Sequence, residues 1–144
     1  MRAVDTNVLV VAASEASPHH EIAQDLLRIL SEDSRPWAIP WPCIYEFLRV
    51  VTHPRVLRPP IPMKTALKGL GGLTSSPSLR LLHETPRHEE VMRGVLDESA
   101  ATGNLVHDAH IVALCLEHGV REIVTGDRDF ARFPGLTILN PFAA

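Results

Sequence analysis

The chain has 144 residues, of which 45% are hydrophobic and 22% charged, and its net charge is −3 with histidine counted as neutral. This composition is ordinary for a globular protein, and the length suits a single domain over residues 1–144. No apolar run approaches the roughly 20 residues that a membrane-spanning helix needs, and the charged N-terminus does not resemble a secretion signal. These features favour a cytoplasmic protein with no membrane partner.

Strands and helices are expected to alternate along the first half of the chain. Ser17 and Pro18 form a helix-start signal, with Ser17 as the N-cap and Pro18 at the first helical position. His53-Pro54 should end a later helix, because a residue before proline resists the helical region. The expected elements are a strand at 1–4, helices at 8–13 and 17–31, a strand at 37–40, a helix at 42–52, a proline-rich loop at 55–62 and a helix at 63–73.

The second half continues this alternation. Thr85-Pro86 is a helix-start signal of the same kind, and Gly119 should cap the end of a strongly apolar helix. Cys43 and Cys115 fall within apolar helical patterns and should be buried free thiols. The expected elements are a strand at 79–83, helices from 85 to about 102 and at 105–118, a strand at 122–125, a turn and short helix at 127–133 and a strand at 136–139. This order predicts an α/β fold with a mainly parallel sheet covered by helices on both faces.

Charge is unevenly distributed along the chain. Residues 47–83 contain no Asp or Glu, and their basic residues are Arg49, Arg55, Arg58, Lys64, Lys68 and Arg80. A basic surface can attract nucleic acid, and it can equally be a solvated face or a docking surface for a protein.

Several common catalytic motifs are missing. The sequence contains no Gly-x-x-x-x-Gly-Lys loop and no Gly-x-Ser-x-Gly elbow. Residues 69–72 are glycine-rich but do not follow an expected strand. Lys64 and Lys68 are the only lysines, so no late strand supplies the lysine of a phosphoaspartate enzyme. A phosphatase with Asp5 as its nucleophile would also need an aspartate at position 7, which is occupied by Asn7.

Acidic residues follow two of the expected strands. Asp5 comes directly after the first strand, and Asp127 follows residues 122–125 after one glycine. Residues just past the carboxyl ends of parallel strands converge on one crevice, so these two carboxylates should meet. Each could instead form a local turn at its strand end.

Three further acids are candidates for the same place. Glu46 lies in an otherwise apolar helical stretch, and Asp108 lies near the start of the helix at 105–118. Glu46 could simply face solvent, Asp108 could serve the helix dipole, and Asp129 could cap the short helix that follows it.

An oxygen-rich cluster of this kind suits the hard cations Mg²⁺ and Mn²⁺. Carboxylates held close together repel one another unless a cation or protons neutralise them. His107 and His110 could bind zinc, but two histidines at this spacing on an exposed face are more often unliganded.

Four segments together resemble the PIN domain, and within it the VapC-like toxins, over essentially the whole chain. Each segment is a weak motif alone, but their order and intervals are specific. The segments are Val4-Asp5-Thr6-Asn7-Val8-Leu9, Pro42-x-x-x-Glu46-x-x-Arg49, Asn104-x-x-x-Asp108-Ala109-x-Ile111-x-Ala113 and Val124-Thr125-Gly126-Asp127-Arg128-Asp129-Phe130.

The resemblance implies a PIN-like parallel sheet of about five strands and Mg²⁺- or Mn²⁺-dependent endonucleolytic cleavage of RNA. The four acidic positions of the family fall on Asp5, Glu46, Asp108 and Asp127. Metal ligands are expected among Asp5, Asp108, Asp127 and Asp129. The expected supporting residues are Thr6, Asn7, Asn104 and Thr125, and the candidates for holding RNA phosphates are Arg49 and Arg128.

The resemblance also implies a cognate antitoxin that lays a helix in a groove between the helices at 17–31 and 42–52. Trp41, Tyr45 and Phe47 are candidate apolar anchors there, or they could fill the core. Homodimers are common in such proteins. The alternatives are a non-catalytic PIN scaffold that binds RNA or protein, and a DNA-directed or structure-specific nuclease of related fold.

Overall fold

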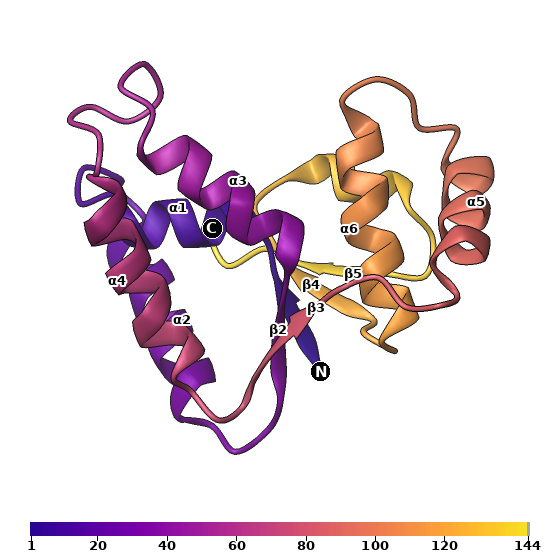
Figure 1. The fold of residues 1–144 in the computed structure, drawn as a ribbon, viewed down its shortest axis with the longest axis horizontal. Helices are drawn as coiled ribbons and strands as arrows, with labels where there is room; N and C mark the ends of the chain where they lie inside the picture. Colours follow the sequence, from indigo (N-terminus) through magenta and orange to yellow (C-terminus); the bar gives the residue numbers. More distant parts are fainter. Residues whose placement is uncertain (144) are drawn as a thin grey trace.

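A five-stranded parallel sheet forms the centre of the protein, as described for residues 1–143 by a computed structural model (Figure 1). Its spatial order is β3-β2-β1-β4-β5, and all neighbouring strands pair in parallel. The strands are β1 (Arg2–Val4), β2 (Trp37–Pro40), β3 (Leu79–Leu82), β4 (Glu122–Val124) and β5 (Thr137–Leu139). The expected α/β fold with a mainly parallel sheet is therefore confirmed.

Helices cover both faces of this sheet, with α1 to α4 on one side and α5 and α6 on the other (Figure 1). The helices are α1 (Thr6–Ala13), α2 (His20–Glu32), α3 (Trp41–Val51), α4 (Met63–Thr74), α5 (His88–Ser99) and α6 (Leu105–Glu117), and a 3-10 helix, η1, covers Arg128–Arg132. Among the residues described, no helix is long and apolar enough to span a bilayer.

Burial on both faces explains the apolar character of the central strands. Ala3 and Ala38 pair between β1 and β2, and both are fully buried, as is Ile123 of β4. Helix α6 packs its apolar residues against the sheet and is the most deeply buried helix. Cys43 and Cys115 are buried and free, as expected from their apolar surroundings.

Two helices begin later than their sequence signals predicted. Helix α2 begins at His20 rather than at Pro18, because the Ser17 hydroxyl accepts a hydrogen bond from the backbone N–H of His19 at 3.3 Å. Helix α5 begins at His88 rather than at 86, because the Thr85 hydroxyl accepts from the N–H two residues later at 3.2 Å. Both hydroxyls form a local turn, which competes with helix formation at these positions.

Helix α5 also ends earlier than expected, at Ser99 rather than near residue 102. Ala100 has a φ of 54°, in the left-handed region, so it cannot continue the helix. At the end of α6, Gly119 takes a φ of 72° and terminates the helix as its sequence position predicted.

Phe130 connects the core to the segment that follows β4. It lies on η1, is fully buried and packs against Phe133 with ring centroids 6.4 Å apart. Truncation to Phe130→Ala is expected to lower the free energy of unfolding by about 3–5 kcal/mol, because it leaves a cavity in the core. Denaturant unfolding measures this change.

Tyr45→Ala is the matched control, because it removes an aromatic ring that is 66% exposed. It should change the free energy of unfolding by no more than about 0.5 kcal/mol. Equal losses in the two variants would contradict the position assigned to Phe130.

Candidate active site

The ends of β1 and β4 bring distant residues together at one edge of the sheet. Val4 pairs with Val124, so Asp5 and Thr125 follow neighbouring strands at the same level. The N–H of Asp5 donates to the Val124 carbonyl at 3.1 Å, which extends the pairing beyond the strand. Asp5 is only 5% exposed. The expected convergence at the carboxyl ends of the strands is present.

Asp5 is oriented by donors from two other elements. The Thr125 hydroxyl donates to its Oδ2 at 2.8 Å, and the Cys43 thiol donates to its Oδ1 at 3.6 Å. Burial raises the pKa of Asp5 from its ordinary 3.8 to about 6, although these hydrogen bonds act in the opposite direction, and the charge of Glu46 adds to the increase. These neutral donors thus orient the Asp5 carboxylate without pairing it with a positive charge.

Glu46 reaches the same place from α3, which begins directly after β2. The Thr6 hydroxyl donates to Glu46 Oε2 at 3.1 Å, and Arg49 Nη2 lies 3.9 Å from Glu46 Oε1. The side chain of Glu46 is 45% exposed, so one part faces the acidic residues and the other faces solvent. The Thr6 hydroxyl is therefore positioned to orient one oxygen of the Glu46 carboxylate.

The loop after β4 is held against α1 by Asn7. Its Oδ1 accepts from the N–H of Gly126 at 3.3 Å and from the Thr125 hydroxyl at 3.5 Å. A Cβ atom on Gly126 would lie 3.0 Å from the ring of Phe142 and 3.3 Å from the amide nitrogen of Asn7. Glycine therefore allows the close approach that aims the next residue, Asp127, at the other acids.

Asp127 rather than Asp129 caps the short helix η1. Asp127 Oδ1 accepts from the N–H of Asp129 at 2.9 Å, and the N–H of Asp127 donates to the Thr125 hydroxyl at 3.0 Å. The suggested capping role for Asp129 is therefore wrong, because Asp129 already lies within the first turn. Asp127 thus forms a local turn after β4, which the sequence offered as an alternative role, and it also belongs to the acidic cluster.

Asp108 completes the cluster from the first turn of α6. Carboxylate oxygens of Asp108, Asp127 and Asp129 lie within 4.8 Å of one another. Burial, followed by the charges of Asp127 and Asp5, raises the pKa of Asp108 from 3.8 to about 7. Asp108 also lies in the first turn of α6, where a carboxylate is favoured by the helix dipole, so the dipole alternative is present alongside its position in the cluster.

One cavity of about 270 Å³ is lined by four of the five predicted acids, all except Asp129. Its polar lining consists of Asp5, Thr6, Asn7, Glu46, Asp108 and Asp127. Asn104 was expected to support this cluster, but it is exposed, does not line the cavity and makes no side-chain hydrogen bond within residues 1–143.

The donor set of this cavity fits a divalent hard cation. Its charged donors are carboxylate oxygens, which Mg²⁺ and Mn²⁺ prefer. The pKa values of Asp5 and Asp108 are raised partly by the neighbouring acids, and a bound cation would relieve that repulsion. The same residues can therefore hold a metal ion close to a polar, partly enclosed space.

A larger cleft of about 620 Å³ adjoins the acidic cavity and shares Glu46 with it. Trp41 and Tyr45 line it from α3, with exposures of 37% and 66% and ring centroids 5.8 Å apart. The prediction that Trp41, Tyr45 and Phe47 all line the groove between α2 and α3 is therefore wrong for two of them: Phe47, although nearly buried, lines that groove, whereas Trp41 and Tyr45 are exposed in the cleft described here. The opposite wall includes Glu84, which no local sequence pattern distinguishes from other acidic residues.

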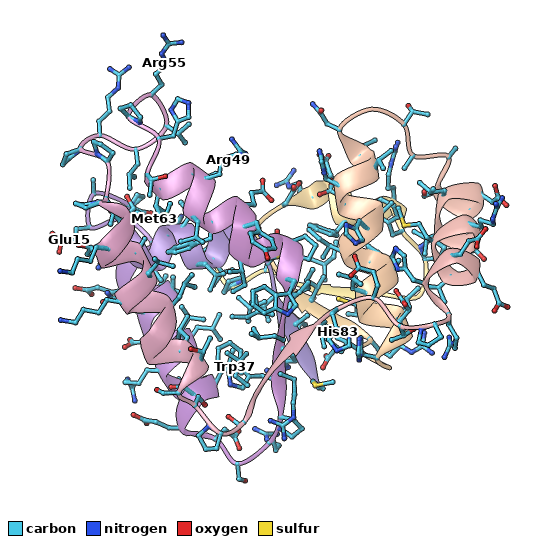
Figure 2. The ribbon with its side chains drawn as sticks, in the orientation of Figure 1. Glu15, Trp37, Arg49, Arg55, Met63 and His83 are labelled. Carbon is cyan, nitrogen blue, oxygen red and sulfur yellow. The ribbon has the colours of Figure 1, made fainter. Side chains whose placement is uncertain are left out.

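The basic residues have different positions around this site. Arg49 lies beside Glu46 and borders the cleft, and Arg128 is exposed directly after Asp127. Figure 2 shows Arg55 projecting outward from the loop after α3. The basic segment therefore contributes only Arg49 to the lining of this cleft.

Comparison with known proteins shows the family. A profile of the PIN domain matches residues 2–136. Ribonuclease VapC48 of Mycobacterium tuberculosis is 40% identical over 140 residues, which cover 96% of each chain.

Solved structures share the fold at lower sequence identity. One is a toxin–antitoxin complex from Klebsiella pneumoniae, with a TM-score of 0.64, 17% identity and full coverage of both chains. Another is M. tuberculosis VapC20, a toxin that cleaves the sarcin–ricin loop, with a TM-score of 0.64, 16% identity and coverage of 95% of this chain and 99% of the other. On the strength of the profile match and the VapC48 relative, this chain belongs to the PIN domain family.

Proposed function

We propose that the chain is a Mg²⁺- or Mn²⁺-dependent endoribonuclease that hydrolyses RNA phosphodiester bonds and serves as the toxin of a toxin–antitoxin module. The observation that carries this proposal is the cavity lined by Asp5, Glu46, Asp108 and Asp127, which reach it from α3, from α6 and from the connections after β1 and β4. A similar protein that spans nearly the same length is named a ribonuclease. Retention of all four acids favours an enzyme over a non-catalytic PIN scaffold.

Asp5, Asp108, Asp127 and Asp129 are the proposed ligands of the cation. The Thr125 hydroxyl and the Asn7 carboxamide fix Asp5 and the loop after β4 before any ion arrives. When bound, Mg²⁺ would supply positive charge that activates water and neutralises charge on the phosphodiester oxygens.

Glu46 is the acid best placed to handle a proton. Thr6 holds one of its carboxylate oxygens, and the side chain remains partly exposed toward the cavity and the cleft. We assign it the role of orienting the attacking water and accepting its proton. Arg49 beside it and Arg128 after Asp127 would hold RNA phosphates, since guanidinium groups bind phosphate oxygens in a bidentate manner.

The cleft next to the cavity suits single-stranded RNA. Trp41 and Tyr45 expose rings at the border of the acidic site. Aromatic rings of this kind stack on unpaired bases and tolerate different base sequences. A strand that follows the cleft would present its backbone to Glu46, which lines both spaces.

An apolar groove of about 420 Å³ is the proposed place for a helix of the antitoxin. It is lined from α1, α2, α3 and α4 by residues that include Leu9, Leu27, Phe47, Leu70 and Leu73. The groove involves α2 and α3, the two helices that the resemblance implied, together with α1 and α4. An amphipathic helix is the partner that such a groove fits.

Two further properties stay predictions: that the protein forms a homodimer, and that it is located in the cytoplasm.

Asp5→Asn is expected to lower the rate of RNA cleavage by about 100-fold or more, because it removes a charged ligand. The amide oxygen can still accept from Thr125, so the fold should be retained. Cleavage of a labelled RNA in Mg²⁺ measures the effect, and EDTA should abolish the wild-type activity.

Asp25→Asn is the control for this experiment, because Asp25 is a 69% exposed acid on α2. It should cleave RNA like the wild type. A DNA of the same sequence tests the alternative of a DNA-directed nuclease. Full activity of the Asp5 variant, or activity in EDTA, would remove the metal mechanism.

Stability should depend on pH and on Mg²⁺ together. The folded-state pKa values of Asp5 and Asp108, about 6 and about 7, lie above their ordinary 3.8. The folded chain therefore holds protons that the unfolded chain has released, so these groups make the metal-free protein less stable as the pH rises from about 4 to about 7. Mg²⁺ should raise the melting temperature by roughly 5 °C near pH 8 and little near pH 5.

Asp108→Asn provides the comparison, measured by calorimetry in EDTA and in Mg²⁺. Without metal the variant should melt above the wild type near neutral pH, and its response to Mg²⁺ should be smaller. If the melting temperatures of the variant and the wild type changed with pH in the same way, Asp108 would not be a source of the repulsion.

A further inference from the structure

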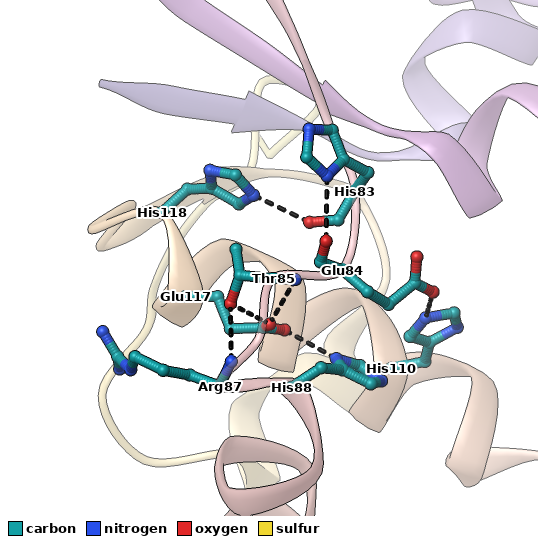
Figure 3. Close-up of polar contacts among 8 residues, drawn as sticks. All are labelled: His83, Glu84, Thr85, Arg87, His88, His110, Glu117 and His118. Carbon is teal, nitrogen blue, oxygen red and sulfur yellow. Dashed lines mark hydrogen bonds and ion pairs between the residues drawn. The ribbon is translucent and has the colours of Figure 1, made fainter.

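We propose a second metal site, for Zn²⁺, formed by Glu84, His88 and His110. These residues lie where the loop after β3 meets α5 and α6 (Figure 3). Each offers one ligand atom, and the three atoms lie within 4.8 Å of one another. None of these residues belongs to the acidic cavity. The site therefore lies outside the acidic cavity, although Glu84 and His110 line the adjoining cleft.

The geometry needs little adjustment to hold an ion. His110 Nε2 and Glu84 Oε1 are 2.8 Å apart, and the rings of His88 and His110 have centroids 5.3 Å apart at an angle of 64°. Two ligand atoms of a tetrahedral zinc ion are ~3.3 Å apart, as follows from zinc–ligand distances near 2.0 Å. The three ligand atoms are therefore close enough for side-chain rotations to bring them around one ion.

A buried carboxylate orients one of the two imidazoles. Glu117 of α6 has a fully buried side chain, and its Oε2 lies 2.7 Å from His88 Nδ1. The other oxygen, Oε1, accepts from the N–H of Thr85 at 3.0 Å and from its hydroxyl at 2.7 Å. With Nδ1 donating to a carboxylate, the Nε2 of His88 carries the free lone pair. Metal-binding histidines are commonly held in this way.

The composition of the set favours zinc over the cation of the acidic cavity. Two imidazole nitrogens and one carboxylate oxygen suit Zn²⁺, whereas Mg²⁺ prefers an all-oxygen set. His88 and His110 are about one-quarter to one-third exposed, so solvent can fill a fourth position. The side chain of Arg87 extends away from the two rings (Figure 3), so it does not place a positive charge between them.

The site would connect three segments around the RNA cleft. Glu84 and His110 line that cleft, and His88 is the first residue of α5. A zinc ion held by all three would fix the loop after β3 and the start of α5 against α6. Its expected effect is a more stable and better defined cleft wall.

Zinc binding to the purified full chain tests the proposal. The protein is treated with a chelator and transferred to buffer with excess Mg²⁺, which competes with zinc for the acidic cavity. Competition against a chromophoric zinc chelator then gives the affinity and stoichiometry, and one equivalent is expected. X-ray absorption at the zinc edge of the wild type should show two imidazole nitrogens at ~2.0 Å. A shell of oxygens alone would overturn the proposal without any variant.

Substitutions then assign the ligands. His88→Ala and His110→Ala should each weaken zinc binding by about 100-fold, and Glu117→Gln by about 10-fold through the lost orientation of His88. Glu84→Gln changes a side chain that is 52% exposed, so it tests the site with little risk to folding. It should weaken binding by about 10-fold or more.

Two controls separate this site from its neighbours. His107→Ala removes an exposed histidine of α6 that lies outside the cluster, and it should leave zinc binding unchanged. Asp108→Asn alters the acidic cavity and should also keep the zinc equivalent. Loss of zinc in the Asp108 variant, or wild-type affinity in the folded His88 and His110 variants, would show that the cluster is only a network of ion pairs.

Discussion

Repulsion among the acids at one edge of the sheet is the constraint on which the site depends. The pairing of Val4 with Val124 fixes Asp5 at this edge, and α6 brings Asp108 to it. Burial together with the neighbouring negative charges raises the pKa of Asp108 to about 7. Within residues 1–143, Arg49 is the only cation that forms an ion pair with one of these acids. The fold thus keeps a deficit of positive charge, which a divalent ion is suited to fill.

The residues around the acids fix their directions without removing their charge. Thr125 donates to Asp5, and Thr6 donates to Glu46, both through neutral hydroxyls. Asn7 holds the backbone of the loop after β4 rather than an acidic side chain. Neutral donors preserve the negative potential of the cavity, whereas a lysine in their place would neutralise it. This arrangement gives a preorganised anionic site at some expense of stability.

Sequence patterns predicted the features that depend on local order or on the ends of strands. The order of the elements and the meeting of Asp5 with Asp127 follow from hydrophobic patterns and from the rule for parallel strands. The predicted helix start at Ser17 was wrong. A serine hydroxyl can either cap a helix or close a local turn, and the amino-acid sequence does not distinguish these two roles. The cluster around Glu84 was also missed, since only the packing of α5 on α6 brings His88 to His110. The spacing along the sequence drew attention only to His107 and His110, a pair that was expected to be unliganded.

Helix α6 is the element that both sites share. Asp108 faces the acidic cavity, and His110 lies two residues later, which turns its side chain by about 200° around the helix axis. The two side chains therefore serve different surroundings although they are close in sequence. The donor types differ in the same way: carboxylate oxygens at one site, and imidazole nitrogens with one carboxylate at the other. Because Zn²⁺ prefers imidazole nitrogen more strongly than Mg²⁺ does, zinc would favour the second site, and the acidic cavity would remain available to Mg²⁺. In this proposal one helix supplies ligands to two ions of different chemistry.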